Sequence, residues 1–300
     1  MSAKAAASIP VVLDTDIGTD IDDAWALAML LRSPELDLKL VTSATGDTET
    51  RARLACRTLE VAGRTDVPVG VGVPGGEIAI GQAAWIGDYR LSDYPGAVHE
   101  DGVAAMIDII MASAEPVTLV AIGPLTNVAA ALEREPRIAK RARFVGMHGS
   151  LKWSHHAGHG AIGEYNVKTD VAACRRAFAA PWEKTITPLD TCGRVRLTGE
   201  RYRAISESPD PLARAVVENY RIWREAGGQG AGDASTVLFD TVAVYLSFSE
   251  ALLRVEPMRL AVTDDGRIVE SPDGDALRVA IEWKDLPAFE DLLVRRLAGT

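Results

Sequence analysis

The chain has 300 residues, of which 47% are hydrophobic and 25% charged, a balance that excludes disordered and collagen-like proteins and allows a substantial core. Its 32 Lys and Arg residues against 42 Asp and Glu residues give a net charge of −10, which disfavours nucleic acid and anionic membranes as partners. The three cysteines, Cys56, Cys174 and Cys192, lack paired spacing, which argues against a disulfide framework and favours a reducing, cytoplasmic location. No apolar run approaches the ~18 residues that cross a bilayer, so we expect no membrane-spanning segment.

Short apolar runs alternate with amphipathic stretches along the chain, a pattern typical of strands that alternate with helices. The predicted strands cover residues 9–14, 38–44, 67–72, 117–123, 142–147, 184–190 and 258–263. The predicted helices cover residues 22–33, 48–63, 102–114, 124–134, 169–179, 210–226, 237–248 and 285–298. Fully apolar strands are buried on both faces, so we predict an α/β fold with a doubly wound, mostly parallel central sheet flanked by helices. Residues 1–8 are predicted to be a disordered lead-in, and residues 9–300 a single domain.

Two segments interrupt this alternation without helix or strand character. One is rich in Gly and His and covers residues 148–163, and the other, GGQGAGDAS, covers residues 227–235. Loops of this length in a compact domain are usually functional. Because ligands of open α/β sheets bind beyond the carboxyl ends of the strands, we expect both segments to lie over such a site.

Acidic residues crowd the end of the first predicted strand. The sequence DTDIGTDIDDAWALAML places five aspartates directly before an apolar-periodic helix: Asp14, Asp16, Asp20, Asp22 and Asp23. Helix capping accounts for one or two of them. The others repel one another unless a cation neutralises them. A donor set of oxygens, without Cys or His, favours Ca²⁺ or Mg²⁺ over zinc.

The same motif and three later segments together resemble a known enzyme family. DTDIGTDIDDAWAL, IGPLTNVAAAL (122–132), GEYN (163–166) and LFDTVAV (238–244) are similar, in order, to motifs of the inosine-uridine-preferring nucleoside hydrolases. The resemblance spans roughly residues 9 to 250. It implies a Ca²⁺ cofactor, a small-molecule nucleoside or N-riboside as substrate, and a homodimer or homotetramer.

The resemblance also implies roles for individual residues. Four would hold the calcium ion, the third through its backbone carbonyl: Asp16, Asp23, Thr126 and Asp240. Asp22 would be the general base for the attacking water, with Asp20 as an alternative because this loop is longer than the family's short form. Glu164 and Asn166 of GEYN would bind the ribose hydroxyls, and carboxylates beside the ring would stabilise its developing positive charge.

The chain departs from the family pattern at three positions. Asp47 stands where many members have an Asn, and it accepts from a sugar hydroxyl but cannot donate as Asn would. Gly158 stands where an Asn often helps to bind the sugar. Phe239 stands where a His commonly protonates the leaving base, and it is expected to stack on the base or to pack in the core. The sequence therefore leaves the leaving group open: a purine, a pyrimidine or that of an unusual N-glycoside.

Other residues are candidates for the leaving-group side of the site. His99, in AVHEDG, resembles a family segment that places a His near the base, so it is a candidate acid. Tyr220 and Trp223 share one face of a predicted helix, where they belong to the core or to a lid over the base. The first long loop holds four more histidines: His148, His155, His156 and His159. Their HHxxH spacing suggests zinc, but no carboxylate motif supports it.

Taken together, these features predict a Ca²⁺-dependent hydrolase that cleaves the N-glycosidic bond of ribonucleosides or related N-ribosides to free base and ribose. A nucleoside- or sugar-binding protein without turnover is an alternative that fits Phe239, Gly158 and Asp47. A phosphohydrolase of the haloacid dehalogenase type is another, with Asp14 attacking phosphorus and Asp16 as the acid. This second alternative leaves the later motifs unexplained.

Overall fold

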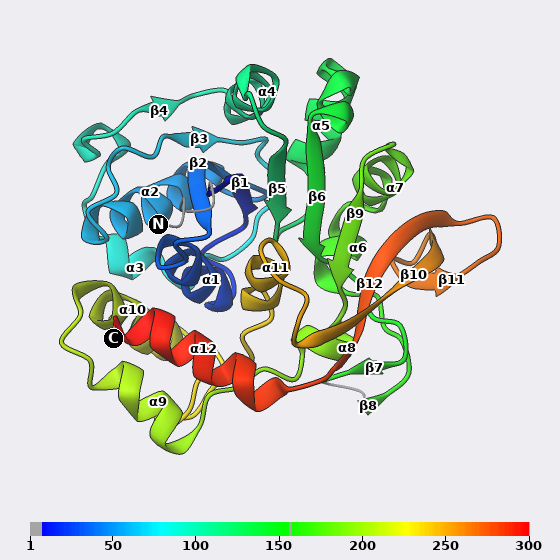
Figure 1. Ribbon diagram of the computed structural model, residues 1–300. Helices are drawn as coiled ribbons and strands as arrows, with labels where there is room; N and C mark the ends of the chain where they lie inside the picture. The colour runs from blue at the N-terminus through cyan, green and yellow to red at the C-terminus, as the bar shows by residue number, and fades with distance from the viewer. Residues whose placement is uncertain (1–7, 156–157, 300) are drawn as a thin grey trace, which may run out of the picture.

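A ten-stranded sheet forms the centre of the computed structural model, which describes residues 8–155 and 158–299. Its strands lie in the order β11-β10-β12-β9-β6-β5-β1-β2-β3-β4 (Figure 1). The strands are β1 (Ile9–Thr15), β2 (Leu36–Ser43), β3 (Val69–Val71), β4 (Val98–His99), β5 (Val117–Ala121), β6 (Ala142–Met147), β9 (Lys184–Thr187), β10 (Leu253–Val262), β11 (Ile268–Glu270) and β12 (Asp275–Trp283). Neighbours from β4 across to β12 pair in parallel, whereas β10 pairs antiparallel with β11 and β12. A separate hairpin joins β7 (Trp153–Ser154) to β8 (Gly158–His159).

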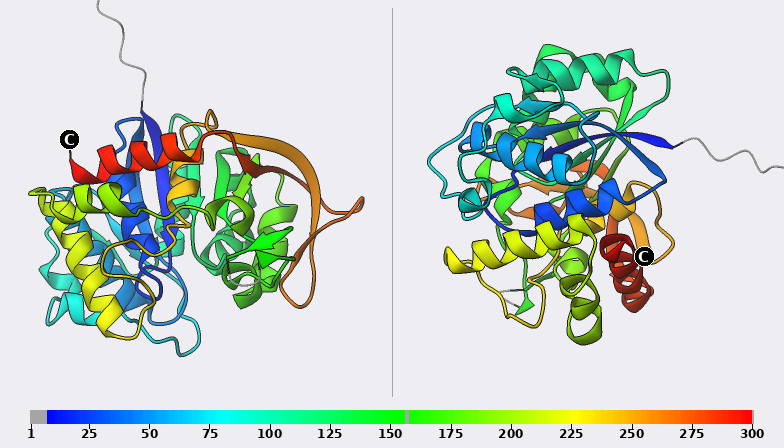
Figure 2. Two further views of the ribbon diagram at one scale, coloured as in Figure 1. Left: turned by 90° about the horizontal axis from the view of Figure 1, so that it is seen from below. Right: turned by 90° about the vertical axis from the view of Figure 1, so that its left-hand side faces the viewer.

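Helices cover both faces of the sheet, as Figure 2 shows. They are α1 (Asp22–Leu31), α2 (Thr48–Val61), α3 (Ala83–Ile86), α4 (Gly102–Ala112), α5 (Thr126–Arg134), α6 (Tyr165–Thr169), α7 (Val171–Ala179), α8 (Leu189–Cys192), α9 (Gly199–Ser206), α10 (Pro211–Glu225), α11 (Thr241–Leu246) and α12 (Leu286–Ala298). One face carries α4, α5 and α7, and the other carries α1, α2 and α11, with α10 and α12 packed against α1. The predicted doubly wound, mostly parallel fold is confirmed.

Two apolar layers, one on each face of the sheet, hold the helices in place. Successive side chains of a strand point to opposite faces, so Leu13 of β1 belongs to the layer under α1 and its neighbour Val12 to the layer under α4 and α5. Trp25 of α1 and Phe144 of β6 are large, fully buried members of these two layers. Burial of both sheet faces explains why the central strands have continuous apolar sequences.

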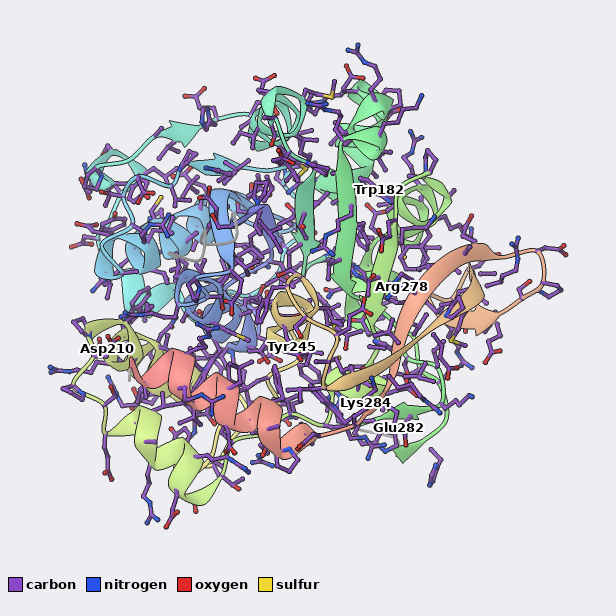
Figure 3. The ribbon with its side chains drawn as sticks, viewed as in Figure 1. Trp182, Asp210, Tyr245, Arg278, Glu282 and Lys284 are labelled. Atoms are coloured by element: carbon purple, nitrogen blue, oxygen red, sulfur yellow. The ribbon has the colours of Figure 1, made fainter. Side chains whose placement is uncertain are left out.

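Two of the helices next to the site are held in place by contacts at the ends that lie away from it. Tyr245 of α11 is labelled in Figure 3. Its ring packs edge-on against Phe289 of α12, with centroids 5.3 Å apart. Asp210 caps the start of α10 and pairs with Arg32 at the end of α1, at 2.5 Å between Oδ2 and the guanidinium nitrogen. These contacts determine where the start of α11 and the end of α10 lie.

The prediction missed part of the C-terminal region. Strand β12 was not expected, because its sequence DALRVAIEW mixes charged and apolar residues and gives no continuous apolar run. The strand predicted at 258–263 begins at Leu253, and the helix predicted at 237–248 begins at Thr241. Of the predicted lead-in, residues 1–7 lie outside the described part of the chain. Within the described residues, no helix combines the length and apolar character needed to cross a membrane.

Candidate active site

Four neighbouring parallel strands, β9, β6, β5 and β1, end at one cavity of about 340 Å³, called here the inner cavity. It is lined by residues at or just after the carboxyl ends of these strands: Leu189, Met147, Ile122 and Asp16. Residues of the first long loop, among them Ile162, complete the wall. A cavity at this edge is where an open α/β sheet binds its ligand.

Three buried aspartates meet in the wall of the inner cavity. Carboxylate oxygens of Asp22, Asp23 and Asp240 lie within 4.8 Å of one another. Asp22 and Asp23 open helix α1, and Asp240 immediately precedes α11. The backbone N–H of Asp240 donates to Oδ2 of Asp22 at 3.3 Å, and the hydroxyl of Thr15 donates to Asp23. A convergent set of carboxylate oxygens fits a hard divalent cation, as the sequence motif predicted.

Burial and mutual repulsion make these carboxyl groups weaker acids. Burial, followed by repulsion from neighbouring aspartates, raises the pKa of Asp22, Asp23 and Asp240 well above the ordinary range. Burial also raises the pKa of Asp16, to about 6. Buried like charges ionise together only when a cation compensates them. The electrostatics therefore support a cation at this cluster.

Asp16 lies beside this cluster rather than within it. Its side chain packs against Gly123, where an added Cβ would lie 2.8 Å from Oδ1 of Asp16. The family resemblance assigned Asp16 to the metal and Asp22, with Asp20 as an alternative, to proton transfer. Asp22 shares the cluster with Asp23 and Asp240, so these three carboxylates together could hold a metal ion.

A fully buried arginine holds the acidic loop in place. The Nε of Arg51 donates to the carbonyl of Thr45 at 2.7 Å, and its terminal nitrogens donate to the carbonyls of Asp16 and Ile17 and to the hydroxyl of Thr19. The nearby positive charge opposes the rise in the pKa of Asp16. Arg51 cannot be recognised as a site residue from the sequence, because an arginine in an amphipathic helix gives no local sign of burial.

Asp14 and Asn127 form a structural network behind the inner cavity. Oδ1 of Asp14 accepts hydrogen bonds from the hydroxyl of Thr42 at 2.5 Å and from Nδ2 of Asn127 at 2.8 Å. Asn127 also donates to the carbonyl of Ser43 and accepts from the N–H of Val73, so it joins segments at the ends of three strands. Asp14 is fully buried in this network. It is therefore not placed to attack phosphorus, as the haloacid dehalogenase alternative requires.

Glu164 and Asn166 line the inner cavity and also fix its shape. Glu164 caps α6 and accepts three backbone N–H groups, including that of Gly149 at 3.0 Å. Burial raises the pKa of Glu164 to about 7, although these N–H donors oppose the rise. The amide nitrogen of Asn166 donates to the carbonyls of Ile122 and Met147, both at 3.0 Å. The two side chains thus connect α6 to the ends of β5 and β6.

Three expected site residues lie away from the carboxylate cluster. Thr126 is the first residue of α5, where a backbone carbonyl bonds within the helix, and its hydroxyl donates to Asp170 at 2.7 Å. Ile122 is the residue of the same motif that lines the inner cavity. His99 is exposed on the edge strand β4, and Asp47 is the exposed N-cap of α2.

A second cavity of about 820 Å³, called here the outer cavity, adjoins the inner one. The two share four lining residues: Thr19, Asp20, His155 and Phe239. The ring of His155 meets that of Phe239 edge-on, with centroids 4.8 Å apart. Because both residues line both cavities, this ring pair lies where the two cavities join. Of the other loop histidines, His148 is buried, and His156 lies outside the described residues.

The two aromatic residues expected on α10 have different places. Tyr220 is buried, and its hydroxyl donates to the carbonyl of Ala234 at 3.0 Å. Trp223 stacks on Tyr220, with centroids 6.0 Å apart, and lines the outer cavity. Its indole nitrogen donates to the carbonyl of Thr19 at 2.8 Å. Tyr220 therefore belongs to the core, and Trp223 to the wall of the cavity.

The sequence matches a family model over nearly its whole length. Residues 11–288 match the inosine-uridine preferring nucleoside hydrolases. The chain belongs to this family. It is therefore a nucleoside hydrolase, an enzyme that cleaves ribonucleosides, and the resemblance carried by its four ordered motifs is confirmed.

Related nucleoside hydrolases align with this chain over most of its length. The pyrimidine-specific ribonucleoside hydrolase RihA of Enterobacter sp. (strain 638) is 31% identical over 97% of this chain and 98% of its own. The non-specific ribonucleoside hydrolase RihC of Klebsiella pneumoniae is 30% identical over 86% of this chain and 85% of its own. A solved plant nucleoside hydrolase superposes with a TM-score of 0.84 at 22% identity, covering 98% and 100% of the two chains, and supports the fold.

Proposed function

We propose that this nucleoside hydrolase depends on Ca²⁺ and hydrolyses the N-glycosidic bond of ribonucleosides or related N-ribosides to free base and ribose. The observation that carries the proposal is the cluster of Asp22, Asp23 and Asp240 in a cavity at the carboxyl ends of parallel strands. Of the two relatives, one is named as pyrimidine-specific and the other as non-specific, which supports a ribonucleoside as the substrate.

The clustered carboxylates would hold the cation. Ca²⁺ takes about six to eight oxygen ligands, so three carboxylates leave coordination positions for water and sugar hydroxyls. When bound, the ion would acidify water and orient the ribose. The donor atoms that support this assignment are all carboxylate oxygens, which suit Ca²⁺ better than zinc.

Proton transfer from the attacking water is assigned to Asp16. The carboxylates of the cluster would be engaged with the cation, whereas Asp16 lies beside them in the same cavity. Its packing against Gly123 limits its movement, as a positioned base requires. In the alternative expected from the family resemblance, Asp16 would bind the cation and Asp22 would be the base.

Glu164 and Asn166 are assigned to the ribose. A carboxylate oxygen has two lone-pair directions, so Glu164 accepts from a sugar hydroxyl as well as from backbone N–H groups. Its bonds to the backbone hold it in place before the substrate arrives. Negative charge here stabilises the positive charge that develops on the sugar as the bond to the base breaks.

His155 is assigned to the leaving base in preference to His99. It lines both cavities and contacts Phe239, so it lies on the side of the inner cavity from which the base extends. Histidine commonly donates a proton near neutral pH. Phe239 supplies an aromatic surface against which a base packs. His99 lines neither the inner nor the outer cavity, and it is exposed on β4.

A cytoplasmic location and a homodimer or homotetramer remain predictions. The three cysteines are buried free thiols, which agrees with a reducing compartment. Size-exclusion chromatography with light scattering measures the oligomeric state directly.

The test is an assay of the calcium-loaded protein with inosine, uridine and p-nitrophenyl riboside. Ribose and base are measured after reaction, and a chelator-treated sample is the control. We expect release of ribose that stops with chelation and returns when Ca²⁺ is added. Bound calcium and bound inosine without release of ribose would instead favour the nucleoside-binding alternative.

A further inference from the structure

The charged residues that line the two cavities have opposite signs. Those of the inner cavity are mainly acidic, with one lysine: Asp16, Asp20, Asp22, Asp23, Glu164, Lys168 and Asp240. The outer cavity is lined by Arg194 and Arg196 and, among the described residues, by a single carboxylate, that of Asp20. Because the two cavities share four lining residues, a substrate whose ribose occupies the inner cavity can extend its base toward these arginines.

Both guanidinium groups are held by the protein but retain binding capacity. Arg194 lies 3.7 Å above the ring of Trp153, and its Nε donates to the carbonyl of Asp190 at 3.3 Å. The Nε of Arg196 donates to the carbonyl of Ser235 at 3.0 Å. Neither arginine forms an ion pair within residues 8–155 and 158–299. The planar, multidentate donor of an arginine matches a carboxylate.

Aromatic rings line the same cavity. Trp153, Trp223 and Phe239 come from the first long loop, from α10 and from the segment before α11. Flat rings favour a flat heterocyclic ligand over a flexible chain. The outer cavity therefore combines a surface for a heterocycle with two cations for an anionic substituent.

We propose that the preferred substrates of this enzyme are ribosides whose leaving base carries a carboxylate, which Arg194 and Arg196 recognise. This proposal rests on the proposed function, because it places the ribose in the inner cavity. A 5′-phosphate on the ribose has the same anionic chemistry and is the alternative source of charge. The base carboxylate is favoured because the arginines share their cavity with the aromatic rings.

The test compares nicotinate riboside with nicotinamide riboside, which differ by a carboxylate against a carboxamide. In both, the pair of electrons of the glycosidic bond leaves with the pyridine nitrogen, while water adds to C1′ and releases one proton. Neither base has to be protonated, so the comparison isolates recognition of the carboxylate. We expect kcat/KM for nicotinate riboside to exceed that for nicotinamide riboside by about tenfold or more, as for one charge-assisted contact.

The double substitution Arg194→Gln with Arg196→Gln should bring this ratio close to one. Arg203→Gln, an exposed arginine on α9, is the matched control and should keep the wild-type ratio. A wild-type ratio near one, or a ratio that survives the double substitution, overturns the proposal. So does a double variant that loses its preference for nicotinamide mononucleotide over nicotinamide riboside instead, because the arginines then bind the 5′-phosphate.

Two further measurements separate this proposal from the proposed function. If inosine and uridine release ribose but the nicotinate preference is absent, the enzyme assignment stands and the proposal fails. If no riboside is cleaved, calorimetric binding of free nicotinate and nicotinamide decides the proposal. Tighter binding of nicotinate by about tenfold, lost in the double variant, supports it, and equal binding rejects it.

Discussion

The indole nitrogen of Trp223 donates a hydrogen bond to the backbone carbonyl of Thr19 at 2.8 Å, although 204 positions separate the two residues in the chain. This bond joins the end of α10 to the loop between Asp16 and Asp22. The same loop is held from its other side by Arg51 and by Gln82, whose amide donates to the carbonyl of Asp20. The geometry of the acidic loop thus depends on residues from distant segments.

Trp223→Phe should weaken calcium binding as well as lower the stability of the fold. The substitution keeps an aromatic ring but removes the donor to Thr19, with a loss of about 1 kcal/mol in the free energy of unfolding. We expect a fall of roughly fivefold in calcium affinity, since the loop must then be ordered by the ion itself. Calorimetric calcium titration and urea unfolding measure the two effects.

Trp182→Phe is the matched control for this experiment. Trp182 is also buried and donates to a backbone carbonyl, that of Ala177 at 3.0 Å, but it packs against Phe144 in the layer on the other face of the sheet. Its loss should lower stability by a similar amount without changing calcium affinity. Equal calcium binding in the Trp223→Phe variant and in the wild type would contradict the role given to the loop.

Asp16→Asn and Asp22→Asn should separate proton transfer from metal binding. If Asp16 is the base, Asn at this position keeps most of the calcium affinity and lowers kcat by about 10²–10⁴-fold. Asp22→Asn removes a charge from the cluster, so calcium affinity falls as well as activity. The opposite pattern would return Asp22 to the role of base and Asp16 to the cation.

The metal-free protein should lose stability as the pH rises from about 4 to about 7. Burial raises the pKa of Asp16 to about 6 and that of Glu164 to about 7, above ordinary values near 4. Between the ordinary and the raised pKa the folded state binds more protons than the unfolded state, so raising the pH favours unfolding. The cluster carboxylates act in the same direction.

Thermal melts in chelator at several pH values check this expectation. We expect Tm to fall by on the order of 5 °C across this range and saturating Ca²⁺ to remove most of the fall. Asp240→Asn, which deletes one of the repelling charges, should show a smaller fall than the wild type in chelator. A Tm that rises with pH in the metal-free protein would contradict the charge arrangement described here.

His155→Ala should affect substrates according to their leaving groups. Inosine and uridine need their bases protonated, so we expect kcat to fall by about 10²-fold or more. p-Nitrophenolate leaves without a proton, so the rate with p-nitrophenyl riboside should change by less than about threefold. His99→Ala is the control and should leave all three rates unchanged, and the reverse result would restore His99 as the acid.

Much of the fold can be predicted from the amino-acid sequence alone. β1, β5 and β6 are apolar on both faces, so their sequences mark them as buried parallel strands wherever they pack. The five aspartates after β1 indicate a cation because like charges cannot gather without one. Local pattern also places α1, α2 and α10 within a few residues of their observed bounds.

The tertiary structure decided which of the candidate side chains meet, beyond the pairing of Asp23 with Asp240 that the family resemblance implied. Asp240 joins Asp22 and Asp23 because α11 packs beside α1, a contact between segments more than 200 residues apart that no local pattern contains. The burial of Arg51 and the entry of His155 into both cavities depend likewise on which elements become neighbours. Sequence determines what each segment can do chemically, whereas long-range packing decides which groups come within bonding distance.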